Sequence, residues 1–230
     1  MPGNSTDKTL IDSLFPTEVV TEEAHPMCLR GTLYPEEEAY LRNALPKRRW
    51  EFTAGRLCSR RALTQFGIEN FPLLVGNNRE PIWPTGIVGS ISHTEGYCGV
   101  AIARKTDVQS IGLDVECIGK LQKDVWKQIC TQQEVSWINS LPSDERQINV
   151  ALVFSAKECL YKCQHTISRQ WLGLHDVMIS VNHDIREFRV RFTINNPFAA
   201  KTRLNGRYFF YDGYVFTGMT IRDSDILSFT

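Results

Sequence analysis

The chain has 230 residues, of which 42% are hydrophobic and 23% are charged, so it is long enough to bury a sizeable core. Its 26 basic and 26 acidic side chains give a formal net charge of +0, which argues against binding nucleic acid or an anionic membrane through overall charge. No stretch approaches the ~20 apolar residues that a membrane-spanning helix needs.

The first two predicted helices differ in charge, since the first begins with acidic residues and the second is basic. Pro35 followed by three glutamates is typical of a helix start, and Pro46 limits that helix. A second helix is expected over residues 47–66, because apolar residues recur there every four positions and basic residues occupy the opposite face. Residues 46–61 contain six basic side chains against the single acid Glu51. This segment is therefore an anion-attracting patch in a neutral protein.

The remainder of the chain alternates strands and helices. Residues 67–86 are rich in glycine, proline and asparagine and predict a loop. Three short strands are expected next as an antiparallel meander, and two helices and four further strands follow them. The strands are predicted at 87–92, 99–103, 110–116, 177–181, 187–194, 208–211 and 214–221, and the helices at 121–140 and 146–166. The pair Asp212-Gly213 predicts a hairpin turn.

This order of elements predicts an α+β protein made of two similar lobes that form a pseudo-dimer. Each lobe is expected to hold a small, mainly antiparallel sheet packed with helices. We expect an N-terminal lobe over residues 1–106 and a C-terminal lobe over residues 107–230. One chain would then supply both walls of a cleft, which favours a monomer.

Two carboxylates lie on one predicted strand. Asp114 and Glu116 are two residues apart, so both point to the same face, with apolar neighbours between them. Two carboxylates at close range repel each other, and a hard cation such as Mg²⁺ resolves that repulsion. A solvated acidic strand face is the alternative reading of the same pattern.

The predicted helix 146–166 presents one acid and one base. Glu158 and Lys162 are four residues apart and share a face, while the opposite face is apolar. A surface ion pair worth ~0.3–0.5 kcal/mol would explain these two residues alone. The neighbouring aromatic residues Phe154 and Tyr161 favour the wall of a cleft instead.

Candidate anion-binding residues lie upstream. Ser92 and His93 end a predicted strand with hydrogen-bond donors, although a histidine there is often only a turn residue. Arg48 and Arg56 on the basic helix, with Arg79 in the loop, could hold a phosphate monoester through two-pronged contacts. Solubility, or docking of an acidic partner, would also explain a basic helix.

These segments, in this order, resemble the 4′-phosphopantetheinyl transferases. The resemblance is to the larger single-chain type that activates peptide and polyketide synthetases, and in particular to its enterobactin synthase component D branch. It covers about residues 34–165 and rests on KRRWEFTAGR (47–56), EPIWP (80–84), GSISH (89–93), GLDVE (112–116) and FSAKECLYK (154–162).

The resemblance implies transfer of the phosphopantetheine arm of coenzyme A to a serine of a carrier protein domain, with release of 3′,5′-ADP. The active site is then expected between the lobes. Mg²⁺ would be held by Asp114, Glu116 and Glu158, and Glu158 and Lys162 would be the catalytic residues. The phosphates of coenzyme A would contact the following residues: Arg48, Arg56, Arg79, Ser92 and His93.

Two other functions remain open from the sequence. The same carboxylates would suit another magnesium-dependent phosphotransferase or nucleotidyl enzyme. A non-catalytic module that binds coenzyme A or a carrier protein is the second alternative, although it would not need all of the acidic and basic residues.

Seven cysteines without a CxxC pair predict reduced, packed thiols, and the polar, acidic N-terminus predicts no signal peptide. We therefore expect a cytoplasmic protein, and the resemblance implies an enzyme of siderophore or nonribosomal peptide biosynthesis.

Overall fold

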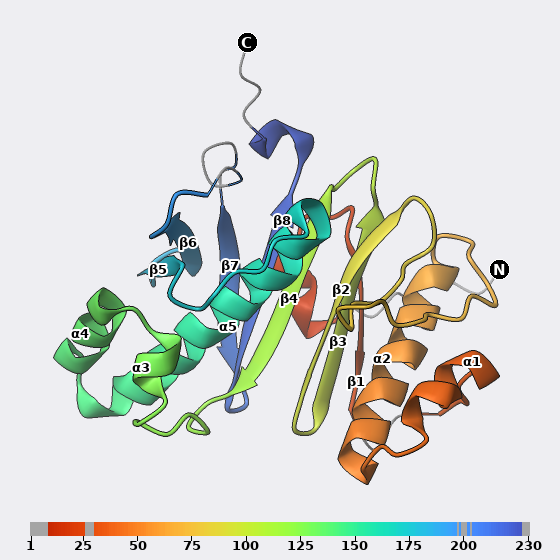
Figure 1. Ribbon diagram of the computed structural model, residues 1–230, viewed down its shortest axis with the longest axis horizontal. Coiled ribbons are helices and arrows are strands. Elements are labelled where there is room, and N and C mark those ends of the chain that lie inside the picture. The colour runs from red at the N-terminus through yellow and green to blue at the C-terminus, as the bar shows by residue number, and fades with distance from the viewer. Residues whose placement is uncertain (1–8, 26–29, 197, 199–201, 203, 227–230) are drawn as a thin grey trace.

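The computed structural model describes residues 9–25, 30–196, 198, 202 and 204–226 (Figure 1). Their strands form two antiparallel sheets, with the orders β1-β3-β2 and β4-β8-β7-β6-β5. The first sheet contains β1 (Val20–Ala24), β2 (Ile87–Thr94) and β3 (Tyr97–Arg104). The second contains β4 (Ser110–Cys117), β5 (Val177–Asn182), β6 (Glu187–Phe192), β7 (Asn205–Tyr211) and β8 (Tyr214–Ile221). The expected division at residues 106/107 falls in the connection between β3 and β4.

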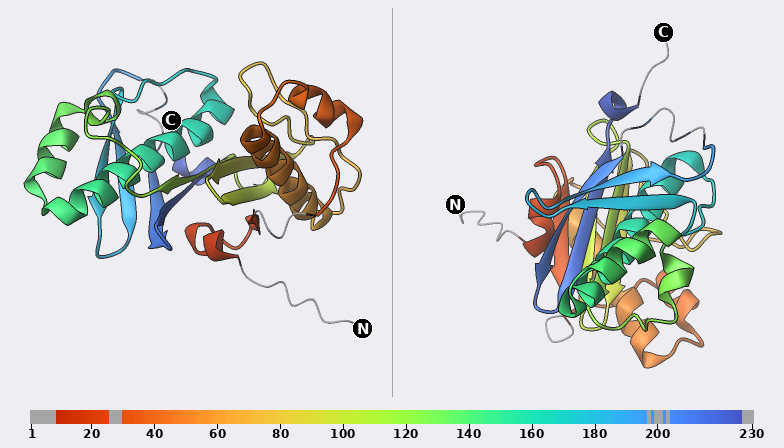
Figure 2. Two further views of the ribbon diagram at one scale, coloured as in Figure 1. Left: turned by 90° about the horizontal axis from the view of Figure 1, so that it is seen from below. Right: turned by 90° about the vertical axis from the view of Figure 1, so that its left-hand side faces the viewer.

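Two long helices cover the same side of these sheets. Helix α2 (Pro46–Thr64) lies over the first sheet and α5 (Ser143–Ser168) over the second, while the 3₁₀ helix η1 (Leu10–Leu14) lies on the opposite side (Figures 1 and 2). Two antiparallel sheets, each packed with helices, confirm the predicted α+β class. No helix in the described part of the chain is long and apolar enough to span a membrane.

The shorter helices differ from the predicted ones in length. The helix that begins at Pro35 is only α1 (Pro35–Glu38), followed by a 3₁₀ turn, η3 (Ala39–Leu41). The single helix expected over 121–140 is instead α3 (Trp126–Ile129) and α4 (Gln132–Ser140). The break occurs at Thr131, whose extended backbone and hydroxyl cap α4 by accepting a hydrogen bond from the Glu134 amide.

The predicted meander of three strands is wrong at its third member. Strands β2 and β3 pair as expected, and the hairpin at Asp212-Gly213 is also confirmed between β7 and β8. Strand β4, however, pairs with β8 of the other sheet, with Asp114 opposite Thr217. The free edge of β3 is occupied by β1, a strand that the sequence analysis did not identify. Strand β4 lies beside β2 without a backbone ladder, and serine side chains of β2 make the connection.

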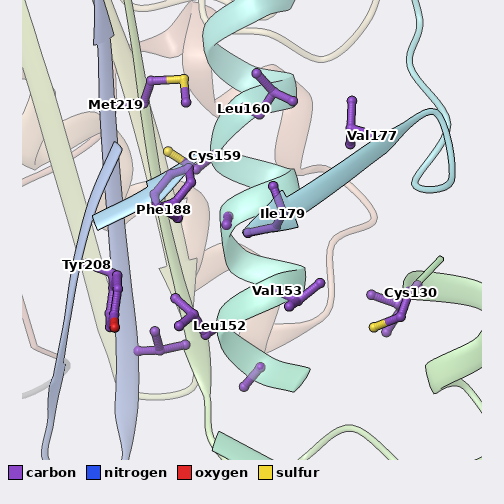
Figure 3. Close-up of a cluster of buried hydrophobic side chains, with 14 of the residues drawn as sticks. Cys130, Leu152, Val153, Cys159, Leu160, Val177, Ile179, Phe188, Tyr208 and Met219 are labelled. Carbon is purple, nitrogen blue, oxygen red and sulfur yellow. The ribbon is translucent and has the colours of Figure 1, made fainter. Parts of the chain in front are cut away.

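One face of helix α5 is buried against the second sheet. Its apolar residues pack between β4 and β8 on one side and β5 on the other (Figure 3). Gly112 of β4 is the point of closest approach, since a methyl group built on it would lie 2.1 Å from the carbonyl oxygen of Cys159 and 3.0 Å from Cβ of Cys163. Only glycine allows the helix to lie this close to the strand.

Replacing this glycine tests the packing of α5. We expect Gly112→Ala to lower the unfolding free energy by ~1–3 kcal/mol or more, because the added methyl group meets backbone atoms that cannot rotate away. Chemical denaturation would measure the loss. Ser180→Ala, at an exposed position of β5, is the control and should stay within about 0.5 kcal/mol of the wild type. Equal stability of the two variants would contradict the close contact.

Candidate active site

Asp114 is the centre of a polar cluster in which β2, β4 and α5 meet. Its side chain is only 4% exposed. One carboxylate oxygen, Oδ1, accepts hydrogen bonds from Lys162 Nζ at 2.6 Å and from Ser92 Oγ at 3.0 Å. Lys162 also donates to Ser92 Oγ at 3.1 Å and to the carbonyl of Leu113 at 3.0 Å. The structure therefore brings together three residues that the sequence placed in three separate motifs.

Lys162 carries its charge in this cluster. Burial acts to lower the pKa of the ammonium group, but the charge and hydrogen bond of Asp114, with the charge of Glu158, outweigh it and raise the pKa. Lys162 is therefore a protonated donor near neutral pH. One lysine alone cannot neutralise the several carboxylates around it.

The hydroxyl of Ser92 is fully used by the protein. It donates to Asp114 Oδ1 and accepts hydrogen bonds from Lys162 Nζ and from the Val115 amide at 3.2 Å. A hydroxyl has one donor and two acceptor sites, so no capacity remains for a ligand. Ser92 was expected to bind phosphate, but its geometry is that of a residue that positions Asp114 and Lys162.

Oδ2 of Asp114 is buried and has no hydrogen-bond partner. Two further carboxylates, Glu116 and Glu158, lie nearby. Burial is the main cause that raises the pKa of Glu116 to about 8, and the charge of Asp114 is the second; the same two causes raise the pKa of Glu158. Within the described ranges, no three His, Cys, Asp or Glu side chains are close enough together to form a ready metal cluster. A buried oxygen without a partner, beside two carboxyl groups that resist ionisation, nevertheless fits a cation.

A second group joins α2 to the end of β2. Arg48 Nη1 lies 3.2 Å from His93 Nε2, and His93 Nδ1 lies 3.7 Å from a carboxylate oxygen of Glu51. Burial lowers the pKa of His93, and Lys162 and Arg48 lower it further against the opposing effect of Glu51. Because an arginine can only donate, Nε2 accepts and His93 is neutral.

Arg56 has a structural contact. Its guanidinium is buried 3.9 Å above the ring of Phe52, and Nε donates to the carbonyl of Leu73 at 2.9 Å. Burial, with a contribution from Arg48, lowers its pKa to about 10. Arg56 thus fixes the loop after α2 while lying close to Arg48.

A cavity of about 760 Å³ lies between the two lobes. One wall is the loop before β2 and the start of β2, including Arg79 and Ser90, and the other wall is α5, including Glu158 and Lys162. Arg48, Arg56 and His93 do not line it. The sequence analysis placed Tyr161 on the wall of a cleft, and it missed two other residues that line this cavity, His165 and Arg169. A polar or aromatic residue at each turn of α5 after Glu158 was the available signal.

The other lysine of the helix motif points away from this cavity wall. Lys157 is buried, pairs with Glu134 at 2.7 Å, and donates to the carbonyls of Ile129 and Leu174 at 2.9 and 2.7 Å. It joins α3, α4 and the segment after α5. Lys157 therefore supports the helix that carries Glu158 without belonging to the acidic cluster.

The arrangement combines buried carboxylates, a cationic lysine and a cavity between lobes, which together suit chemistry on a phosphorylated ligand. Comparison with known proteins agrees with this. Residues 36–103 match the family model of the 4′-phosphopantetheinyl transferase N-terminal domain, and residues 110–217 match that of the 4′-phosphopantetheinyl transferase superfamily.

Two of the named relatives match nearly the whole chain. The 4′-phosphopantetheinyl transferase Svp of Streptomyces mobaraensis is 33% identical over 92% of this chain and 89% of its own length. PptT of Mycobacterium tuberculosis is 32% identical over 93% and 98%, and enterobactin synthase component D of Salmonella typhimurium is 38% identical over 53% and 50%. This chain belongs to the 4′-phosphopantetheinyl transferase superfamily.

Proposed function

We propose that this protein transfers the 4′-phosphopantetheine arm of coenzyme A to a serine of a carrier protein domain, releasing 3′,5′-ADP. The observation that carries the proposal is the buried Asp114–Lys162 pair, with a free carboxylate oxygen, close to a cavity between the lobes. The similarity to enterobactin synthase component D favours carrier domains of siderophore or nonribosomal peptide synthesis as partners.

Asp114, Glu116 and Glu158 are the residues that would hold Mg²⁺. The free Oδ2 of Asp114 and the raised pKa values of the two glutamates support this assignment, since nearby positive charge would favour all three carboxylates in their ionised form. When bound, the ion would neutralise negative charge on the pyrophosphate and on the leaving group.

Glu158 is the candidate general base. Its raised pKa makes it a better proton acceptor than an ordinary carboxylate, and it lines the cavity. The serine hydroxyl of the carrier domain would lose its proton to Glu158, directly or through a water. The serine oxygen would bond to the β-phosphorus as the bond from that phosphorus to the bridging oxygen of 3′,5′-ADP breaks. Lys162, a protonated donor, would stabilise the charge that develops on the phosphate oxygens.

The phosphates of coenzyme A would be held by Arg48 at the start of α2, by His93 at the end of β2 and by Arg79 at the cavity. Arg48 is half exposed and bonded to a neutral histidine, so its remaining donors are available to an anion. The buried Arg56 would add positive charge close to Arg48 without contacting the phosphates directly. Ser92 would act by positioning Asp114 and Lys162.

We also propose that the enzyme acts as a monomer in the cytoplasm. One chain supplies both walls of the cavity, so the site needs no residue from a second copy. The six cysteines that are described are free thiols, and five of them are buried. Packed thiols of this kind fit a reducing compartment.

Asp114→Asn tests the acidic cluster, because it keeps the shape of the side chain and removes its charge. We expect transfer to fall by ~10²-fold or more, since both the cation and Lys162 lose their main partner. Mass spectrometry of a carrier domain after incubation with coenzyme A and Mg²⁺ would measure the added arm.

Two controls accompany this variant. Glu95→Gln changes an acid at an exposed ion pair with Lys120 and should leave transfer unchanged. Chelation by EDTA should stop wild-type transfer, and added Mg²⁺ should restore it. Near wild-type turnover of Asp114→Asn would place the site elsewhere.

Arg48→Ala tests recognition of the 3′-phosphate. A charge-assisted hydrogen bond is worth ~1.5–3 kcal/mol, so we expect affinity for coenzyme A to fall about tenfold or more. Affinity for 3′-dephospho-coenzyme A should change little, as titration calorimetry would measure. Arg61→Ala, on the same helix but paired with Glu22, is the matched control. Equal losses for both ligands would remove Arg48 from this role.

A further inference from the structure

The polar face of α5 continues beyond the residues of the helix motif. Glu158, Lys162 and His165 are separated by four and three residues, so they lie along one face of the helix, and Arg169 follows as its C-cap. All four line the cavity between the lobes. The last two belong to no motif and have no part in the function proposed above.

His165 is buried and yet has polar atoms without a protein partner. The residue is 8% exposed, and its ring packs against Tyr161 with the ring centres 5.4 Å apart. Among the described residues, its side chain makes no hydrogen bond. Neither ring nitrogen is fully enclosed by the protein. The imidazole nitrogens therefore keep access to the cavity. A group that enters the cavity can therefore form a hydrogen bond with this imidazole without displacing a protein partner.

The charge around His165 indicates the chemistry of that occupant. The cavity is lined by four cationic side chains and two carboxylates: Arg79, Lys105, Lys162 and Arg169, with Glu80 and Glu158. Arg169 pairs with Glu80 at 3.3 Å across the cavity, between α5 and the loop before β2. Lys162 is already paired with Asp114 and Arg169 with Glu80, so Arg79 and Lys105 are the lining cations without a carboxylate partner among the described residues. These two cations favour an anionic group, and an imidazole N–H is a suitable donor to a phosphate oxygen.

We propose that His165 is a coenzyme A-binding residue that donates a hydrogen bond from its imidazole to a phosphate of the substrate. This inference rests on the proposed function. The packing against Tyr161 restricts the ring, so the donor is oriented before the ligand arrives and little side-chain entropy is lost on binding. His165 extends phosphate recognition along α5, one turn beyond Lys162.

The test compares two substitutions of this histidine. His165→Phe keeps the ring that packs on Tyr161 and removes the nitrogens, whereas His165→Gln keeps a donor. We expect the phenylalanine variant to bind coenzyme A about tenfold more weakly in titration calorimetry, and the glutamine variant to recover part of that loss. 3′,5′-ADP and 4′-phosphopantetheine, titrated separately, would show which phosphate is contacted.

The matched control is His25→Phe, which changes an exposed histidine that also packs against a tyrosine, Tyr97, away from the cavity. It should bind all three ligands as the wild type does. Thermal unfolding of each variant identifies a loss of fold. If His165→Phe is destabilised, the affinities of His165→Gln for the three ligands test the inference instead.

Two results would overturn the inference. One is unchanged affinity of folded His165→Phe for coenzyme A. The other is a weaker affinity for coenzyme A with neither phosphate-bearing fragment affected. Wild-type protein that neither binds coenzyme A nor modifies a carrier domain would instead reject the proposed function, so the two failures are distinguishable.

Discussion

The structure depends on two serine hydroxyls that replace a strand pairing. Ser90 and Ser92 of β2 accept hydrogen bonds from the Leu113 and Val115 amides at 3.0 and 3.2 Å, so the edge of β4 is satisfied although the two strands share no ladder. Backbone donors left without partners in a buried edge would cost free energy. These contacts join the two sheets, and Ser92 connects that joint directly to Asp114. The side chain that holds the lobes together thus also orients the central carboxylate.

Electrostatics explains why the centre of the molecule suits a phosphorylated substrate and a cation. Asp114 is neutralised on one side by Lys162, but Glu116 and Glu158 share the same region, and burial and mutual repulsion raise both pKa values. Such a surplus of carboxyl groups destabilises a fold unless it is compensated. The surrounding cations, which are Arg48 on α2 and the basic residues that line the cavity, favour anions at the edge of this acidic region. Cation and phosphate would therefore stabilise each other and the protein at once.

The sequence predicted most elements, and it predicted which acidic and basic side chains share a face, because both follow from local spacing. Asp114 and Glu116 share a strand face, and Glu158 and Lys162 share a helix face, whatever surrounds them. The pairing of β4 with β8 could not be predicted in this way, since it joins residues a hundred positions apart and depends on serine side chains at the edge. Similarly, Arg56 reads as a surface cation from its neighbours, but its contacts with Phe52 and Leu73 come from the folded loop. Only the three-dimensional structure reveals that Ser92 has no free hydrogen-bonding site.

The close contact at Gly112 has a consequence for how the enzyme can move. Strand β4 carries Asp114 and Glu116, helix α5 carries Glu158 and Lys162, and the lack of a side chain at Gly112 lets the backbone of β4 lie directly against Cys159 of α5. Arg79 belongs to the other lobe and faces α5 across the cavity, and Arg48 and His93 belong to that lobe too. On the proposed function, this close packing would keep the distances among the three carboxylates nearly constant if β2 and the loop before it shifted relative to α5. The contacts to the phosphates of coenzyme A could then change without a change in the geometry of the carboxylates.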